Sequence, residues 1–205
     1  GHIMNLRTEL PTAENSSNFN AVANAATEAG TTLENLKAAV AGETGASAKY
    51  AAFAKAAKEQ GFDQLARLWE ATSAAEQIHI NLEAALVEAE DSSYVRPTAE
   101  APAPEAIDLN LIASANGEIF ETSDMYPTFI KKAQEEGHAK AVKVFTRAKL
   151  AEAVHAEKYL EAYNNIDAAD DDAYYLCPGC GYIHKGEDFE KCPICGVPKA
   201  KFQRF

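Results

Sequence analysis

The chain has 205 residues, of which 47% are hydrophobic and 24% charged, a composition typical of an ordinary globular protein. Its formal net charge of -12, with no basic stripe, repels phosphate backbones, so we expect no nucleic acid partner. No apolar run approaches the roughly 20 residues that a bilayer span needs, and no leader sequence is recognisable, so we expect no membrane partner and a cytoplasmic location.

The N-terminal region is expected to carry no chemistry. Residues 1–4 have the character of a cloning scar, so His2 is left out of every ligand argument. Residues 5–30 are polar and weakly patterned, which predicts a flexible arm with a short helix near Ala21 to Glu28.

Four helices are predicted after this arm. Thr31 and Glu34 have the spacing of a capping box, and Gly61 suits the end of the first helix. A proline-rich stretch separates the second helix from the third, which is expected to bend near Pro127. The helices are expected at residues 31–61, 63–90, 107–137 and 139–165. The predicted divisions of the chain are the arm at 1–30, the bundle at 31–166, an acidic linker at 167–173 and a C-terminal domain at 174–205.

The two helical hairpins repeat one another at an offset of 76 residues. The matched pairs are Tyr50 with Tyr126, Gly61 with Gly137, Glu76 with Glu152 and His79 with His155. Glu43 instead finds its partner at Glu118, an offset of 75, so one residue has been gained between Glu118 and Tyr126. A single extra residue in a helix is often absorbed as a π-type turn, frequently at a functional site, and we predict such a bulge here.

The repeat places a metal-ligating pattern on all four helices. Residues three apart lie on one helix face, so each Glu-x-x-His pair is a ready chelate, and each hairpin adds one more carboxylate. This is the ligand set of ferritin-like di-iron bundles. Its members are Glu43, Glu76, His79, Glu118, Glu152 and His155. One isolated Glu-x-x-His would be read as a solvated face, but two copies in register predict a buried metal site, because unpaired buried carboxylates are costly.

Three further residues accompany this set as candidate catalytic groups. Glu121 lies three residues after Glu118 on the same face, so it is either a seventh ligand or a surface glutamate. Tyr50 and Tyr126 are equivalent in the repeat. Their hydroxyls are either hydrogen-bond donors to ligand carboxylates or ordinary core groups.

All four cysteines lie in the C-terminal segment as two Cys-x-x-Cys pairs. They are Cys177, Cys180, Cys192 and Cys195, with eleven residues between the pairs. This spacing predicts a tetrahedral thiolate site for one metal ion, which also serves as the core of a domain too small to fold alone. Thiolate geometry accepts iron or zinc. His184 is expected to be a surface residue of this domain, since four cysteines fill the coordination shell.

From about Thr32 to Phe205 the sequence resembles the rubrerythrin family. The matching segments are Ala41-Gly42-Glu43, Glu76-Gln77-Ile78-His79, Gly117-Glu118-Ile119-Phe120-Glu121, Met125-Tyr126-Pro127, Glu152-Ala153-Val154-His155 and the rubredoxin-like Cys177-Pro178-Gly179-Cys180-Gly181-Tyr182. The resemblance implies an all-α ferritin-like four-helix bundle with one long crossover, followed by a small rubredoxin-like four-cysteine knuckle domain.

The resemblance also implies the cofactors and the assembly. Two irons would be held by the six residues above together with Glu121, with Glu76 and Glu152 bridging. One iron would exchange Glu121 for His79 between redox states. A third iron would occupy the four-cysteine site, where recombinant protein can carry zinc. The family is typically a homodimer in which one subunit's four-cysteine iron lies near the partner's di-iron site.

Our leading hypothesis is a peroxidase that reduces hydrogen peroxide to water, since a two-metal clamp can deliver electrons and stabilise both separating oxygens. Electrons would enter at the four-cysteine iron from a separate NAD(P)H-linked reductase or a rubredoxin, and Glu121 is the candidate proton carrier. Two alternatives stay open: a ferroxidase that feeds iron storage, and a zinc-ribbon interaction module on a helical stalk.

Overall fold

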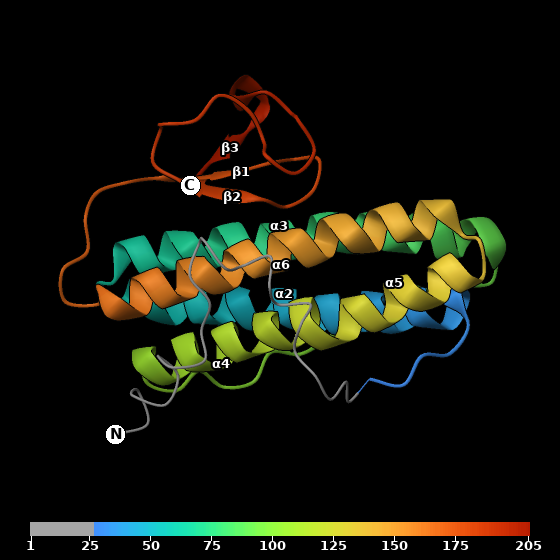
Figure 1. The fold of residues 1–205 in the computed structure, drawn as a ribbon. Helices are drawn as coiled ribbons and strands as arrows, with labels where there is room; N and C mark the ends of the chain where they lie inside the picture. The colour runs from blue at the N-terminus through green and yellow to red at the C-terminus, as the bar shows by residue number, and fades with distance from the viewer. Residues whose placement is uncertain (1–26) are drawn as a thin grey trace.

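The structure, a computed structural model, describes residues 27–205, in which long helices lie side by side and a small β-domain covers one flank (Figure 1). The helices are α2 (Thr32–Glu59), α3 (Asp63–Glu90), α4 (Ile107–Phe120), the π-helical η2 (Glu121–Met125), α5 (Tyr126–Glu135) and α6 (Ala139–Asn164). The predicted ferritin-like bundle is confirmed, with α4, η2 and α5 running on as its third helix. The short helix expected near Ala21 to Glu28 lies outside the described residues except for Thr27 and Glu28, which are not helical.

Local signals in the sequence set the helix boundaries. Thr31 caps α2 in a reciprocal capping box, in which its hydroxyl accepts from Glu34 N and Glu34 accepts from Thr31 N. Gly61 and Gly137 follow α2 and α5 with φ of 83° and 68°, the left-handed conformation that glycine adopts most easily. The two hairpins therefore turn with the same chemistry, as their sequence repeat requires.

The predicted π bulge is confirmed at residues 121–125, where the third helix carries its extra residue. All five side chains of this segment are buried, although four of them are polar. Thr122 Oγ1 donates to Lys149 O of α6 at 2.8 Å, which ties the bulge to the neighbouring helix. The π turn thus directs Glu121 into the bundle, with 8% of the residue exposed.

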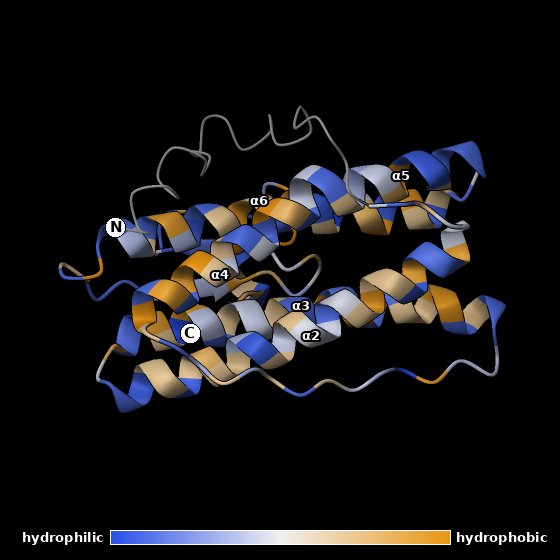
Figure 2. Cartoon of the chain, turned by 90° about the horizontal axis from the view of Figure 1, so that it is seen from below, coloured by the Kyte–Doolittle hydropathy of each residue, from blue (hydrophilic) through white to orange (hydrophobic). Residues whose placement is uncertain are grey.

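A long connection joins the two hairpins. Residues 91–106 leave the end of α3 and run the length of the bundle to the start of α4 (Figure 2). This crossover takes the chain from one end of the bundle to the other, so α4 starts where α2 ends and the second hairpin runs antiparallel to the first (Figure 1). Among residues 27–205, no helix combines the length and apolar character needed to cross a membrane.

The C-terminal domain is a three-stranded antiparallel sheet above α3 and α6 (Figure 1). Its elements are β1 (Tyr174–Leu176), β2 (Ile183–Lys185), the 3₁₀ turn η3 (Lys199–Lys201) and β3 (Gln203–Arg204), in the sheet order β2-β1-β3. Leu176 and Ile183 of the sheet belong to the same apolar cluster as Leu68 of α3. The small sheet therefore uses the bundle surface as part of its own core.

The two largest apolar clusters of the bundle leave a polar layer between them. One contains Phe53 and Trp69, whereas the other contains Leu36, Phe129 and Phe145. The residues predicted to bind metal lie between these clusters along the helices. They are therefore closed off from solvent at both ends.

Candidate metal centres

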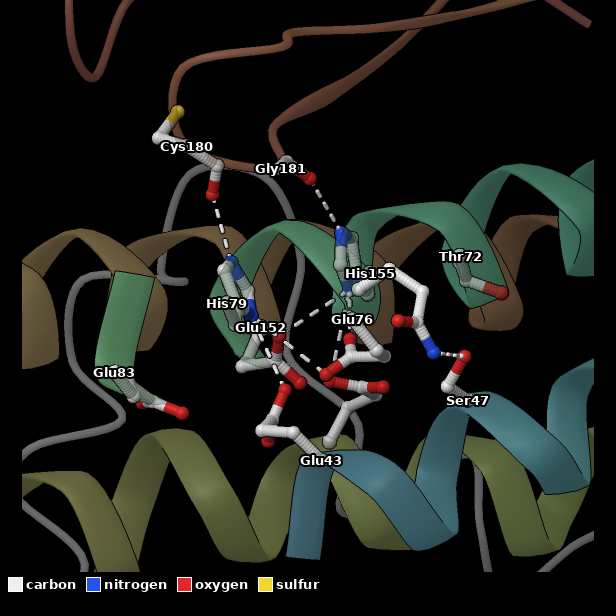
Figure 3. Close-up of polar contacts among 12 residues, drawn as sticks. Glu43, Ser47, Thr72, Glu76, His79, Glu83, Glu152, His155, Cys180 and Gly181 are labelled. Carbon is white, nitrogen blue, oxygen red and sulfur yellow. Dashed lines mark hydrogen bonds and ion pairs between the residues drawn. The ribbon is translucent and has the colours of Figure 1, made fainter. Parts of the chain in front are cut away.

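Six of the predicted ligand residues meet in the polar layer of the bundle (Figure 3). Each is at most 1% exposed, and they come from four different helices. They are Glu43 from α2, Glu76 and His79 from α3, Glu118 from α4, and Glu152 and His155 from α6. The Glu-x-x-His spacing works as predicted, because the glutamate and histidine of each pair face the same interior point.

His79 lies at one end of this cluster. Its Nδ1 is 3.0 Å from Glu152 Oε1 and 3.2 Å from Glu43 Oε2. Glu76 Oε2 lies 3.6 Å from the same nitrogen. One nitrogen and three carboxylates from three helices thus surround a single position.

His155 has the equivalent place at the other end. Its Nδ1 is 3.3 Å from Glu76 Oε1, 3.6 Å from Glu152 Oε1 and 3.7 Å from Glu118 Oε2. The two ligand groups therefore share Glu76 and Glu152, and the candidate ligand atoms within each group lie within 4.8 Å of one another. This arrangement suits a pair of cations with two carboxylates between them.

The other nitrogen of each imidazole meets the four-cysteine domain. His79 Nε2 lies 2.7 Å from Cys180 O, and His155 Nε2 lies 2.7 Å from Gly181 O (Figure 3). A carbonyl oxygen only accepts, so Nε2 of each ring must carry the hydrogen and donate it. This leaves Nδ1 of each ring to face the carboxylates as a metal ligand, oriented by the hydrogen bond behind it.

The donor atoms fit two iron ions. Within the described residues, well-formed hydrogen bonds are missing for Glu43 Oε1, Glu118 Oε2, His155 Nδ1 and both carboxylate oxygens of Glu76 and Glu152. Buried polar atoms are almost always paired, so a set of unpaired oxygens at one point calls for cations. Carboxylate and imidazole are ligands that non-haem iron accepts.

In the metal-free chain, bound protons offset part of the negative charge that metal ions would otherwise offset. Burial alone would lower the pKa of His79, but the hydrogen bond and charge of Glu76 raise it to about 9. The pKa of His155 is likewise raised to about 9, by Glu118 and Glu76 against the effect of burial. Burial raises the pKa of Glu121 well above its usual range, with the charges of Glu76 and Glu118 adding to the effect.

Glu121 is buried beside the ligand set without belonging to either group of four ligand residues. Its Oε2 has no hydrogen-bond partner in the described part of the chain. The structure therefore excludes the surface position considered for Glu121. His79, and not Glu121, belongs to the group of candidate ligand residues at its end of the cluster.

The two candidate tyrosines make different contacts. Tyr50 donates to Glu118 Oε1, as expected of a group that orients a ligand carboxylate. Tyr126 donates instead to Glu83 Oε2 at 2.7 Å. Glu83 is fully buried, and desolvation raises its pKa to about 8. Sequence reasoning missed Glu83, although it follows Glu76 by seven residues and so shares its helix face.

The four cysteines are free thiols whose sulfur atoms converge in the small domain. Cys177 Sγ lies 3.4 Å from Cys195 Sγ, and Cys180 Sγ lies 3.5 Å from Cys192 Sγ. Backbone N–H groups point at these sulfurs, such as Gly179 N at 3.4 Å from Cys177 Sγ. Four converging sulfurs with N–H donors suit a tetrahedral metal ion bound by thiolates.

The other two histidines of residues 27–205 belong to none of the ligand groups, although His184, expected at the surface, is half-buried. His138 is the N-cap of α6, where its Nδ1 accepts from Ala141 N at 3.1 Å. His184 lies on β2, with its Nδ1 2.7 Å from Tyr182 Oη.

Comparison with known families agrees with this geometry. The sequence profile of the rubrerythrin family matches residues 34–163, and that of the rubrerythrin rubredoxin-like domain matches residues 175–203. This chain belongs to the rubrerythrin family. The two profiles together cover the helices of the bundle and the whole four-cysteine segment.

Several rubrerythrin relatives match most of the chain. Nigerythrin of Nitratidesulfovibrio vulgaris is 67% identical over 202 residues, which cover 98% of this chain and 100% of nigerythrin. The rubrerythrin of the same organism is 35% identical over 180 residues, covering 84% and 93% of the two chains. The structure of fully reduced, all-ferrous nigerythrin matches with a TM-score of 0.90 over 97% of this chain and 98% of that one. The carboxylate and cysteine sites described above match the iron cofactors of the rubrerythrin family.

Metal binding to the rubrerythrin bundle should release protons. With a pKa of about 9, His79 and His155 are both protonated at pH 7 in the metal-free chain. A metal ion binds only the neutral ring, so filling both positions should release about two protons or more per chain. Apparent affinity should therefore rise with pH until about pH 9. Anaerobic calorimetric titration with Fe²⁺, in buffers of different ionisation enthalpy and with the cysteine site already filled, measures this release. Heat that does not depend on the buffer would contradict it.

The hydroxyl of Tyr50 should strengthen metal binding. Tyr50→Phe removes the donor that orients Glu118, so affinity for the bundle metals should fall by about tenfold or more. Tyr94→Phe is the matched control, because the Tyr94 hydroxyl has no hydrogen-bond partner in the described residues. Competition with a coloured chelator measures both affinities. Equal metal affinities of the two variants would show that the Tyr50 hydroxyl does not contribute to metal binding.

Proposed function

We propose that this protein is a non-haem di-iron peroxidase, which reduces hydrogen peroxide to water with electrons relayed through the four-cysteine iron. The observation that carries the proposal is the direct contact between the two sites. Both metal-binding histidines donate to backbone carbonyls of the loop that carries Cys180. A covalent path with a single hydrogen bond thus links each candidate centre in the bundle to the cysteine domain.

The reaction consumes two electrons and two protons per peroxide and yields two water molecules. Two bound irons would supply these electrons and Lewis-acid stabilisation of the peroxide oxygens. The protein holds the ligands rigid and keeps bulk water out, because the six ligand residues are buried between two apolar clusters. Glu76 and Glu152 would each help to hold both ions, since each faces both histidines.

Glu121 is the proposed proton carrier and the seventh ligand. It is buried next to the cluster, and one of its oxygens is free of hydrogen bonds in the described part of the chain. With His79 in place of Glu121 as the ligand, the Glu121 carboxyl would be available to carry a proton beside the ligand set. Tyr50 would hold Glu118 in place, and Tyr126 would connect the site to the buried carboxyl of Glu83.

We further propose that the electrons come from a separate NAD(P)H-linked reductase or a rubredoxin, in the cytoplasm. The protein would act as a homodimer, as the family resemblance implies. The resemblance implies that the four-cysteine domain meets the partner's bundle, whereas here the loop and the histidines of a single chain are in contact.

The first test follows both iron centres after the reduced protein meets hydrogen peroxide in an anaerobic stopped-flow spectrometer. The bundle irons should reoxidise first and the four-cysteine iron afterwards, at two ferrous ions per peroxide. Protein with zinc in the cysteine site is the control, because only its bundle irons can change. Reaction with oxygen alone, or a four-cysteine iron that never reoxidises, would favour the ferroxidase or the interaction-module alternative.

Loss of Glu121 should slow peroxide turnover far more than it weakens iron binding. Glu121→Ala removes the proton carrier, and such a group contributes about 10²-fold or more to a rate. Glu135→Ala is the control, since Glu135 is exposed at the end of α5. Turnover rates and iron content are measured on the same preparations. Turnover in Glu121→Ala that equals the control would remove Glu121 from the mechanism.

A further inference from the structure

The two cysteine knuckles of the small domain end in equivalent glycines. Gly181 follows Cys180, and Gly196 follows Cys195, in the repeated pattern Cys-Pro-x-Cys-Gly. Their φ angles are 84° and 82°. Each N–H closes the same turn, Gly181 N to Cys177 O at 3.1 Å and Gly196 N to Cys192 O at 2.9 Å. The knuckle turn therefore requires the same positive-φ backbone conformation at both glycines.

Their surroundings are entirely different. A methyl group added at Gly181 would lie 2.7 Å from His79 Nε2 and 3.3 Å from Ala75 O of α3. A methyl group added at Gly196 would meet no atom within 4 Å. Only the first knuckle, then, has a glycine against which the bundle is closely packed.

The neighbours of Gly181 have no room to move. His79 is fully enclosed, with its Nδ1 held between the carboxylates of Glu152 and Glu43 and its Nε2 bound to Cys180 O. Ala75 O is backbone in the middle of α3. A side chain at position 181 must therefore push the loop away from the bundle, because neither neighbour can give way cheaply.

We propose that Gly181 is a positioning residue whose missing side chain lets the first knuckle dock directly on the ligand histidines. This docking sets the contact through which electrons pass between the two metal sites. The inference rests on the proposed relay and deepens it. Each transfer oxidises the four-cysteine metal by one electron and reduces the bundle pair by one, and two transfers serve one peroxide.

The loop around Gly181 contacts the bundle through two short hydrogen bonds, one to each ligand histidine. Cys180 supplies a thiolate to one site, and its own carbonyl oxygen accepts from His79 at 2.7 Å. The carbonyl of Gly181 accepts from His155 at the same distance. A displacement of the loop by about one ångström would break both hydrogen bonds, since their geometry tolerates little stretching.

Gly181→Ala and Gly196→Ala separate docking from backbone strain. Both variants place alanine at a positive φ in the same turn, so they share the strain of the knuckle itself. Only Gly181→Ala adds the collision with α3. Transfer from the four-cysteine iron to the bundle irons, followed optically after rapid reduction by a radical pulse, should slow by at least about tenfold in Gly181→Ala relative to Gly196→Ala.

A second measurement reads docking without any redox chemistry. In protein loaded with zinc at all sites, hydrogen exchange should quicken at residues 177–185 and 75–80 in Gly181→Ala, beyond the change in Gly196→Ala. Ala75→Val adds bulk to the bundle side of the same contact, since Ala75 Cβ would lie 3.4 Å from a methyl group added at Gly181. It leaves the knuckle sequence intact, so it should lift the loop even if Gly181→Ala fails to fill its cysteine site.

The outcomes separate this inference from the proposed function. Slow transfer and fast exchange in Gly181→Ala and Ala75→Val, with Gly196→Ala near the parent, support the positioning role. Equal transfer rates and equal exchange in the two glycine variants overturn it. If the parent protein shows no transfer between its sites, the relay fails as a function, and the exchange measurement still decides whether Gly181 controls docking.

Discussion

The rest of the structure depends on the burial of carboxylates at the centre of the bundle. Glu43, Glu76, Glu118 and Glu152 are withdrawn from water, and most of their oxygens lack a well-formed hydrogen bond among the described residues. Such a layer would oppose folding unless positive charge occupied it, because a buried carboxylate without a partner is strongly destabilising. Protonated histidines offset part of this charge in the metal-free chain. Two irons would complete the compensation, so metal binding and bundle stability are coupled.

The same histidines join the bundle to the cysteine domain. Each ring uses Nδ1 toward the carboxylates and Nε2 toward a loop carbonyl, so one side chain serves both sites. The sheet adds apolar contact, since Leu176 and Ile183 belong to the same apolar cluster as Leu68 of α3. A domain of this size depends on its metal and its neighbour for stability. The interface between the bundle and the cysteine domain therefore contributes both to the proposed relay and to the stability of the small domain.

The sequence predicted what repeats and fixed spacings can encode. The offset of 76 residues located the helical ligands, its slip to 75 located the π turn, and the two Cys-x-x-Cys pairs located the thiolate site. Docking of the small domain could not be predicted in this way. It depends on distant contacts, such as Cys180 O with His79, and on the space beside Gly181, and neither leaves a periodic signal in the chain.

Departures from the repeat give the two ends of the site different chemistry. Tyr50 donates across the bundle to Glu118, but its counterpart Tyr126 donates to Glu83, a residue whose own counterpart is Tyr159. The extra residue of η2 lies in the same half and brings Glu121 inside. Two further buried carboxyls, Glu83 and Glu121, thus interact with the charge of His79, whereas the repeat places Tyr159 at the position equivalent to Glu83. A two-iron site built from a duplicated hairpin can therefore bind both ions alike and still concentrate proton transfer and ligand exchange at one of them.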